Sequence, residues 1–360
     1  MDHTFIPADV AVERDGFRVE IGAPILHVNN ELRGRSGHMS HAMVEKDGAI
    51  LAFNSNCSPV RCRGHAAYGW IEYRYSHNGG KTFSEPVELP YSKEAFLNGL
   101  FTVSVEKAVV CPDGTLIAFC LRNTMLAPVC CEPWFTPTVI RSHDFGKTWE
   151  PAVECSPYRG RIYDAVIRDG IVYFLQFCND GEKHFCGNLP EHVYRLFVST
   201  DGGKTFSVRS VLPGDCINRG YGALQFAPDG TLHAYRYNLK AEREMDHLVS
   251  CDNGQTWELL APCYLEKGIR NPQTAVVNGI FLLHGRGEKD RGFVFYTSPD
   301  GTVWDDGVYL ETEKKLCYYS NNLVLRDGKR EHLLVQYSDV YRDACVNVMH
   351  RFVTVERQSE

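Results

Sequence analysis

No run of apolar residues in this sequence approaches the roughly 18 that a membrane-spanning helix needs. The first residues, MDHTFIPADVAVERDG, lack the basic and apolar segments of a secretory signal peptide. We therefore expect a cytoplasmic protein with no membrane partner, unless a leader has been removed. A net charge of −7 argues against a basic surface, so no nucleic-acid partner is expected. None of these features predicts an oligomeric state.

Metal-binding and phosphate-binding patterns are also lacking. The 14 cysteines are scattered, no C-x-x-C pair occurs, and only Cys130 and Cys131 are adjacent. Buried thiols in a reducing compartment explain such cysteines better than disulfides do. No glycine-rich loop of the phosphate-binding type is found. The sequence therefore predicts neither a metal site nor a cofactor.

One short motif recurs along the chain. SHDFGKTWEP begins at Ser142, and related copies begin at Ser76, Ser199, Ser250 and Ser298. Their spacing of roughly 50 to 65 residues is too long for a solenoid of helical pairs and suits the four-stranded blade of a β-propeller.

Six apolar segments, each with Asp-Gly or Asn-Gly near its middle, predict six β-hairpins. They begin at Ala42, Ala108, Ala165, Ala223, Ala275 and Leu323. A third strand follows each of the first five, and the repeated motif then leads into a fourth strand. We therefore predict an all-β chain that folds as one six-bladed β-propeller domain over residues 1–360. Segment 17–28 is expected to close the ring by joining the last blade.

The repeated motif, an Asp box, has the residues of a structural turn. A short carboxylate accepts backbone N–H groups of its own turn, glycine supplies a positive φ, and the following Trp or Phe is buried. The first copy carries Asn78 in place of the Asp, which a turn tolerates and a catalytic acid does not. We therefore predict that Asp144, Asp201, Asp252 and Asp300 hold the turns between third and fourth strands and take no part in chemistry.

The functional candidates come from propeller geometry. Residues just before each innermost strand, and those between the second and third strands, converge on one mouth of the funnel. Many of them are arginines, whose planar guanidinium groups suit carboxylates. The candidates are Arg33, Arg35, His38, His41, Arg61, Arg63, His65, Glu106, Arg122, Arg161, Tyr163, Asp164, Arg219, Tyr221, Arg236, Arg270, Asn271, Arg286, Arg291, Tyr318 and Tyr319.

At these residues the chain resembles the sialidase (neuraminidase) superfamily, whose six-bladed propeller with Asp boxes binds the sugar carboxylate through three arginines. Arg236 in DGTLHAYRYN and Arg291 in RGFVFYTS match two of these arginines. Tyr319 in CYYSNNLVLRDG matches the nucleophilic tyrosine. The resemblance implies a carboxylate clamp formed by Arg236 and Arg291, and a retaining reaction through a glycosyl-tyrosine. The predicted substrate-binding set also includes Arg270, Tyr221 and His38.

The chain departs from that pattern at three places. GRSGHMSHAMV carries histidines where the first arginine triplet is expected, and no carboxylate occurs between Phe53 and Ile71, where the acid/base is expected. NRGYGALQF has Tyr221 near the place of the glutamate that polarises the tyrosine. His38 or His41 could replace the acid/base, and Asp164 could instead activate water in an inverting reaction. Glu106, Glu132, Glu242 and Glu244 are further possible carboxylates.

Three functions remain open from the sequence. The first is a sialidase-like glycoside hydrolase acting on a terminal acidic sugar of a small oligosaccharide or glycoconjugate, with Tyr319, Asp164 and His41 as candidate catalytic residues. The second is a non-catalytic propeller that binds an acidic sugar. The third is a scaffold without a small ligand.

Overall fold

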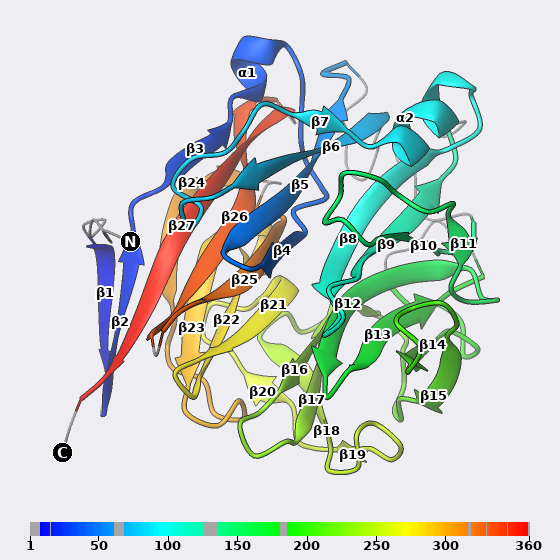
Figure 1. Ribbon diagram of the computed structural model, residues 1–360. Helices are drawn as coiled ribbons and strands as arrows, with labels where there is room; N and C mark the ends of the chain where they lie inside the picture. The colour runs from blue at the N-terminus through cyan, green and yellow to red at the C-terminus, as the bar shows by residue number, and fades with distance from the viewer. Residues whose placement is uncertain are drawn as a thin grey trace.

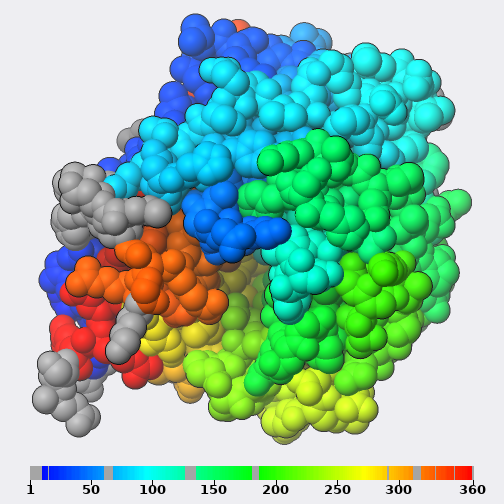
Figure 2. Space-filling model, viewed as in Figure 1, coloured from blue at the N-terminus to red at the C-terminus, as the bar shows by residue number. Residues whose placement is uncertain are grey.

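The computed structural model shows six antiparallel sheets arranged around a central axis, as predicted for a six-bladed β-propeller (Figure 1). It describes residues 8–14, 16–60, 68–125, 135–180, 186–315, 318–328, 330–343 and 345–358, and only the backbone of 8, 9, 290, 291 and 311–315. The blades follow one another in chain order around a central hollow on the face that Figure 2 shows.

In each of the first three blades, four strands run in order from the axis to the rim. These strands are β4 (Met43–Lys46), β5 (Ala49–Cys57), β6 (Gly69–Ser76) and β7 (Val87–Glu88); β8 (Thr102–Val110), β9 (Leu116–Asn123), β10 (Thr138–Ser142) and β11 (Val153–Glu154); and β12 (Gly160–Arg168), β13 (Ile171–Cys178), β14 (Val193–Ser199) and β15 (Ser207–Val211). The two α-helices, α1 (Asn30–Arg33) and α2 (Pro90–Leu97), precede β4 and β8 respectively.

Blades four and five continue the same plan. Their strands are β16 (Arg219–Phe226), β17 (Leu232–Asn238), β18 (Glu244–Ser250), β19 (Glu258–Leu259) and β20 (Cys263–Tyr264); and β21 (Arg270–Val277), β22 (Ile280–Gly287), β23 (Arg291–Ser298) and β24 (Val308–Lys315). A 3₁₀ helix, η1 (Glu288–Asp290), joins β22 to β23.

The sixth blade confirms the predicted ring closure. It combines β25 (Ser320–Asp327), β26 (Arg330–Arg342) and β27 (Cys345–Arg357) with β2 (Phe17–Gly22) and β1 (Ala8–Arg14) from the other end of the chain. Both β2 and β3 (Ile25–Val28) pair with β27. The ring is therefore closed by backbone hydrogen bonds between residues that are more than three hundred positions apart.

The repeated motifs form the turns between third and fourth strands, as expected. Asp144 Oδ1 accepts hydrogen bonds from Ser142 Oγ and from the Thr148 backbone N–H, each at 2.8 Å. Asn78 makes the corresponding contacts with Ser76 Oγ at 2.9 Å and Thr82 N at 3.0 Å. The amide thus replaces the carboxylate without loss of the turn, which supports a structural role for the motif.

Apolar side chains fill the spaces between adjacent blades. One cluster joins blades three and four through residues such as Leu175, Tyr194 and Leu232, and another joins blades one and two through Phe53, Val105 and their neighbours. Nine of the ten cysteines in the described ranges are buried, and Cys251 is exposed. In the part of the chain that the structure describes, no helix is long and apolar enough to cross a membrane.

Candidate functional site

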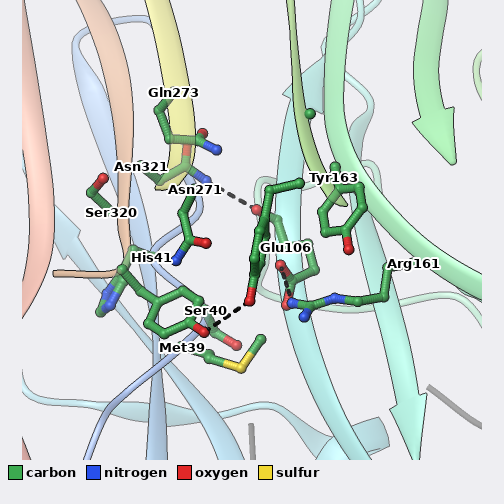
Figure 3. A pocket seen from close by; sticks show the side chains of 13 residues that line it. Met39, Ser40, His41, Glu106, Arg161, Tyr163, Asn271, Gln273, Ser320 and Asn321 are labelled. Atoms are coloured by element: carbon green, nitrogen blue, oxygen red, sulfur yellow. Dashed lines mark hydrogen bonds and ion pairs between the residues drawn. The ribbon is translucent and has the colours of Figure 1, made fainter. Parts of the chain in front are cut away.

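A cavity of about 40 Å³ lies at the axis, where the first halves of the innermost strands meet (Figure 3). Its lining comes from all six blades or the segments leading into them. The lining residues are Met39, Ser40, His41, Glu106, Arg161, Tyr163, Tyr221, Gly222, Asn271, Gln273, Tyr319, Ser320 and Asn321. Seven of these belong to the set predicted from propeller geometry.

A β-bulge in each innermost strand of blades two to five supplies part of this lining. The register shifts lie between Val105 and Lys107, Ile162 and Asp164, Gly220 and Gly222, and Arg270 and Gln273. The residues inside the bulges include Glu106, Tyr163, Tyr221 and Asn271, and all four line the cavity. In a regular strand successive side chains point to opposite faces of the sheet, whereas a bulge can redirect one of them. The bulges therefore explain how four neighbouring blades each contribute a side chain to one site.

Left-handed backbone conformations gather at the same place. Ser40 has φ 70°, Tyr221 φ 43° and Asn271 φ 57°, and all three line the cavity. Tyr318, directly before the cavity residue Tyr319, has φ 77°. Non-glycine residues adopt this region at a cost, and such residues cluster at functional sites more often than elsewhere.

Two tyrosines face each other in the cavity. The Tyr221 and Tyr319 hydroxyl oxygens are 3.1 Å apart, close enough for a hydrogen bond. The His38 ring packs edge-on against Tyr319, with ring centroids 4.6 Å apart. Burial raises the pKa of Tyr221 well above its ordinary value, and the neighbouring Tyr319 adds to the rise, while Arg161 and Arg270 oppose it. Tyr221 therefore keeps its proton at neutral pH.

Three arginines lie around this tyrosine pair, and of these Arg161 lines the cavity while Arg270 and Arg286 lie behind its lining. The Arg161 guanidinium carbon lies 5.6 Å from the centre of the Tyr221 ring, and that of Arg286 lies 5.1 Å from the Tyr319 ring. Arg270 is directly opposite Arg286 in the β21–β22 pairing. Glu106 forms an ion pair with Arg161 at 3.5 Å, and it is the one carboxylate among the described residues that line the cavity.

The structure places Arg236 differently from the predicted clamp. Its side chain is 1% exposed, and Arg236 Nη2 lies 2.8 Å from Asp246 Oδ2. Pro213 O accepts a second hydrogen bond from Arg236 Nη1 at 3.0 Å. Arg236 is not among the cavity-lining residues. The side chain of Arg291 lies outside the described residues, so the predicted contact between the two arginines stays a prediction.

Asp164 connects three blades. Its Oδ1 accepts the backbone N–H of Ala165 at 2.8 Å and lies 3.0 Å from Lys107 Nζ in blade two. Its Oδ2 accepts the backbone N–H of Leu224 in blade four at 2.8 Å. Lys107 also donates to Asn321 Oδ1 at 2.6 Å. Asp164 is not among the cavity-lining residues. Its contacts link blades two, three and four, and they occupy both carboxylate oxygens that an acid or base would need.

The two predicted histidines differ in position. His41 lines the cavity and is 3% exposed, and burial lowers its pKa to about 4. It is therefore neutral at pH 7 and could accept a proton there. His38 contacts the site through the Tyr319 ring.

Most remaining candidates are engaged in other contacts. Arg33 is paired with Glu72, Arg35 with Asn56, Arg122 with Glu154, Arg219 with Asp246, and Glu242 with Tyr237. Arg61, Arg63, His65 and Glu132 lie outside the described residues. Within the described ranges no group of three His, Cys, Asp or Glu side chains could hold a metal ion.

Sequence reasoning missed five polar or small residues of the cavity, namely Ser40, Gly222, Gln273, Ser320 and Asn321, as well as Met39. Gln273 follows the bulge in β21, whose position no residue pattern announces. The lining residues Ser320 and Asn321 directly follow Tyr319, so their place next to a candidate nucleophile was the available signal.

Comparison with known proteins relates the fold to that of the sialidases. No family model and no curated protein matches the sequence. A protein of unknown function from Dyadobacter fermentans is 15% identical, with TM-score 0.69, over 94% of this chain and 99% of that one. A Hadza microbial sialidase is 14% identical, with TM-score 0.68, over 93% of this chain and 68% of that one.

A variant of the NanB sialidase from Streptococcus pneumoniae is 10% identical, with TM-score 0.64, over 92% of this chain and 70% of that one. At such low identity the likeness concerns the fold and assigns no activity. The chain is thus a six-bladed β-propeller of the sialidase-like type.

Proposed function

We propose that this protein is a glycoside hydrolase that acts on a terminal acidic sugar, bound over the axial cavity. The observation that carries the proposal is the placement of the paired hydroxyls of Tyr319 and Tyr221 among Arg161, Arg270 and Arg286. Guanidinium groups bind carboxylates through paired hydrogen bonds. They would therefore hold the acid group of the sugar beside the Tyr319 hydroxyl.

In this proposal Tyr319 is the nucleophile. As its oxygen forms a bond to the anomeric carbon, the Tyr319 proton passes to a base, the bond to the leaving oxygen breaks, and that oxygen takes up a proton. Water later cleaves the glycosyl-tyrosine with net retention, giving its hydroxyl to the sugar and a proton back to the Tyr319 oxygen. A neutral phenol is less repelled by an anionic sugar than a carboxylate nucleophile would be. Tyr221, which keeps its proton, would donate a hydrogen bond to the Tyr319 oxygen, and Arg286 beside the ring would favour negative charge there.

Two cavity residues could handle the remaining proton transfers. Glu106 and the neutral His41 both line the cavity, so either could take the proton of the incoming water. Asp164 is the weaker candidate because Lys107 and two backbone N–H groups occupy its carboxylate oxygens.

A binding function without turnover is the second candidate. It is favoured by one observation: Tyr221 stands where a carboxylate would be expected to polarise Tyr319, and its hydroxyl oxygen lies 3.1 Å from that of Tyr319. A phenol that keeps its proton is a poor base. A propeller with this site could hold an acidic sugar and leave its glycosidic bond intact.

Two assays separate these candidates. Fluorogenic sialosides, uronides and neutral glycosides test turnover, and calorimetry with free sialic acid and free uronic acids tests binding. The hydrolase proposal expects turnover of an acidic glycoside and none of the neutral ones. Binding without turnover would favour the second function, and neither binding nor turnover would reject both.

A matched pair of variants makes the test specific. Arg286→Ala removes a cation beside the cavity residue Tyr319, and Arg168→Ala removes one that lies 4.9 Å from the ring of Phe226, which is not a cavity residue. The proposal expects Arg286→Ala to lose most of the affinity for the acidic sugar and Arg168→Ala to retain it. Equal losses of affinity in both variants would show that the net charge of the protein, and not the position of Arg286, determines binding.

A further inference from the structure

Asn271 combines a strained backbone with a side chain that makes no hydrogen bond to the residues that the structure describes. It has φ 57° and is 4% exposed. Within the described part of the protein, neither its Oδ1 nor its Nδ2 makes a hydrogen bond. Buried amide groups are nearly always paired, because leaving one unpaired is costly.

The side chain of Asn271 is directed at the cavity that holds the tyrosine pair (Figure 3). Gln273 lines the same cavity at 9% exposure, and its Nε2 donates to Pro272 O at 2.9 Å. The Gln273 Oε1 has no hydrogen-bond partner among the described residues. This wall of the cavity therefore offers two acceptor oxygens and one N–H₂ donor.

The β21 bulge that turns Asn271 inward is held by close backbone packing. A Cβ atom on Gly285 would lie 2.8 Å from Arg270 O and 2.9 Å from Asn271 O, so the facing strand needs glycine at this position. The strain and the unpaired amide thus occur together in a closely packed part of the sheet. A fold gains nothing from this combination in itself, and residues under strain are typical of sites that bind or react.

The chemistry of this wall indicates the group that it would take. A carboxylate only accepts hydrogen bonds, so the two acceptor oxygens would repel it, whereas the three arginines of the cavity region suit it. A hydroxyl group donates one hydrogen bond and accepts others, which matches an amide oxygen beside an amide N–H₂. The cavity of about 40 Å³ has room for a group of this size.

We propose that Asn271, assisted by Gln273, is a specificity residue that binds one hydroxyl group of the ligand, while the arginines bind its acid group. This inference rests on the proposed acidic sugar ligand and adds a second point of recognition. An acidic sugar with a hydroxyl at the position that enters the cavity would be preferred over the analogue that lacks it.

The test compares Asn271→Gly with Asn278→Gly. Both residues have a positive φ, 57° and 49°, and belong to the β21–β22 hairpin, but Asn278 lies at the turn and donates to Val355 O at 2.7 Å. Glycine is compatible with both backbone conformations. Only the first change removes the cavity amide, whereas the second removes a hydrogen bond that the fold uses.

Specificity is measured with a sialoside or glucuronide that the wild-type protein turns over. If the protein binds acidic sugars without turnover, the free sugar acid is used instead. In either case the monodeoxy analogues of the same sugar are compared with it. We expect one deoxy analogue to lose about tenfold in kcat/KM or affinity in the wild-type protein, the scale of one buried hydrogen bond. In Asn271→Gly this ratio should fall to about one, and in Asn278→Gly it should persist. An unchanged ratio in Asn271→Gly overturns the proposal and leaves the proposed function standing.

Thermal unfolding supplies a readout that needs no ligand. We expect the melting temperature of Asn271→Gly to equal or exceed that of the wild-type protein, and that of Asn278→Gly to fall. If no acidic sugar binds or is turned over, the proposed function fails, and the hydroxyl subsite fails with it. If Asn271→Gly loses as much thermal stability as Asn278→Gly, the amide is structural and the proposal is wrong even where an acidic sugar binds.

Discussion

The hydroxyl oxygens of Tyr319 and Tyr221 lie 3.1 Å apart, although 98 positions separate the two residues in the chain. Tyr319 comes from the segment leading into blade six, and Tyr221 from the bulge of blade four. They meet because the innermost strands of the blades converge on the axial cavity. The propeller architecture therefore positions the tyrosine pair. The role of each hydroxyl can be tested separately by changing one tyrosine at a time to phenylalanine.

Tyr319→Phe should retain the affinity for an acidic sugar and abolish turnover. The change removes one oxygen from the reacting centre and leaves the aromatic contacts with His38 and Arg286 in place. Calorimetry measures the affinity, and a fluorogenic glycoside measures the rate. Near wild-type turnover would mean that Tyr319 is a packing residue and that water attacks the sugar directly.

Tyr221→Phe should lower kcat without a comparable change in KM. The variant loses the hydroxyl that contacts Tyr319 but keeps the ring against Arg161. If Tyr221 stabilises negative charge on the Tyr319 oxygen, the loss should be about tenfold or more, as for one hydrogen bond to a charged group. The matched control is Tyr75→Phe, which removes a hydroxyl bonded to Phe145 O, outside the cavity lining.

Asp164→Asn should destabilise the fold by about 3 kcal/mol, because it leaves Lys107 buried without its carboxylate partner. Denaturant unfolding measures the loss. Asp169→Asn, in the same blade, changes an 84% exposed side chain and should alter stability by less than about 1 kcal/mol. A stable Asp164→Asn variant with lost turnover would instead favour the catalytic role first predicted for this residue.

Arg236→Ala should also act through stability. Arg236→Ala removes one of the two guanidinium groups that pair with the buried Asp246, and Arg219 Nε remains 2.9 Å from Asp246 Oδ2. The loss should therefore stay below the roughly 3 to 5 kcal/mol that an uncompensated buried charge costs. The double variant Arg236→Met with Asp246→Leu should recover much of this loss. If Arg236→Ala is stable but loses the affinity for acidic sugars, the clamp predicted from the sequence is supported after all.

Acid should destabilise the protein well above the range where carboxylates titrate. Burial lowers the pKa of His41, His247 and His350 to about 4, and that of His284 to about 3, from an ordinary 6.5. The unfolded chain therefore binds more protons than the folded one between these values, so unfolding free energy is lost as pH falls below 6.5.

Melting temperatures at pH 7.5 and pH 5, read by circular dichroism, check this sign, and His350→Leu should reduce the difference. A second loss should follow below about pH 4, because hydrogen bonds from their own turns hold the pKa values of Asp144 and Asp252 at about 2, against an ordinary 3.8. Equal melting temperatures at pH 7.5 and pH 5 would contradict the burial of neutral histidines.

The sequence predicted the architecture well because its repeats encode it directly. Six hairpins and five turn motifs identify the blades, and segment 17–28, which forms the two strands β2 and β3, was correctly assigned to the ring closure. The expectation that residues near the start of each innermost strand converge on one mouth of the propeller also selected Glu106, Arg161 and Asn271. All three line the cavity. These predictions rest on local turn chemistry and on the order of strands, both of which a single sequence carries.

The site was harder to predict, since it depends on register. Arg236 faces Asp246 directly across the β17–β18 pair. This pairing can be recognised only when the register of the two strands is known. The bulges at Glu106 and Asn271 shift side chains by one position without a sequence signal. Sequence spacing alone therefore identified the correct mouth of the propeller. It could not distinguish an arginine beside the cavity from one whose guanidinium group pairs with a buried carboxylate elsewhere.

A crystal structure with free sialic acid or glucuronic acid at saturating concentration tests the central claim most directly. The account predicts the sugar over the axial cavity, with its carboxylate toward Arg161, Arg270 and Arg286 and its anomeric carbon next to the Tyr319 oxygen. A sugar bound elsewhere on the propeller, or an axial cavity that takes no acidic sugar at concentrations that saturate binding in solution, would contradict it.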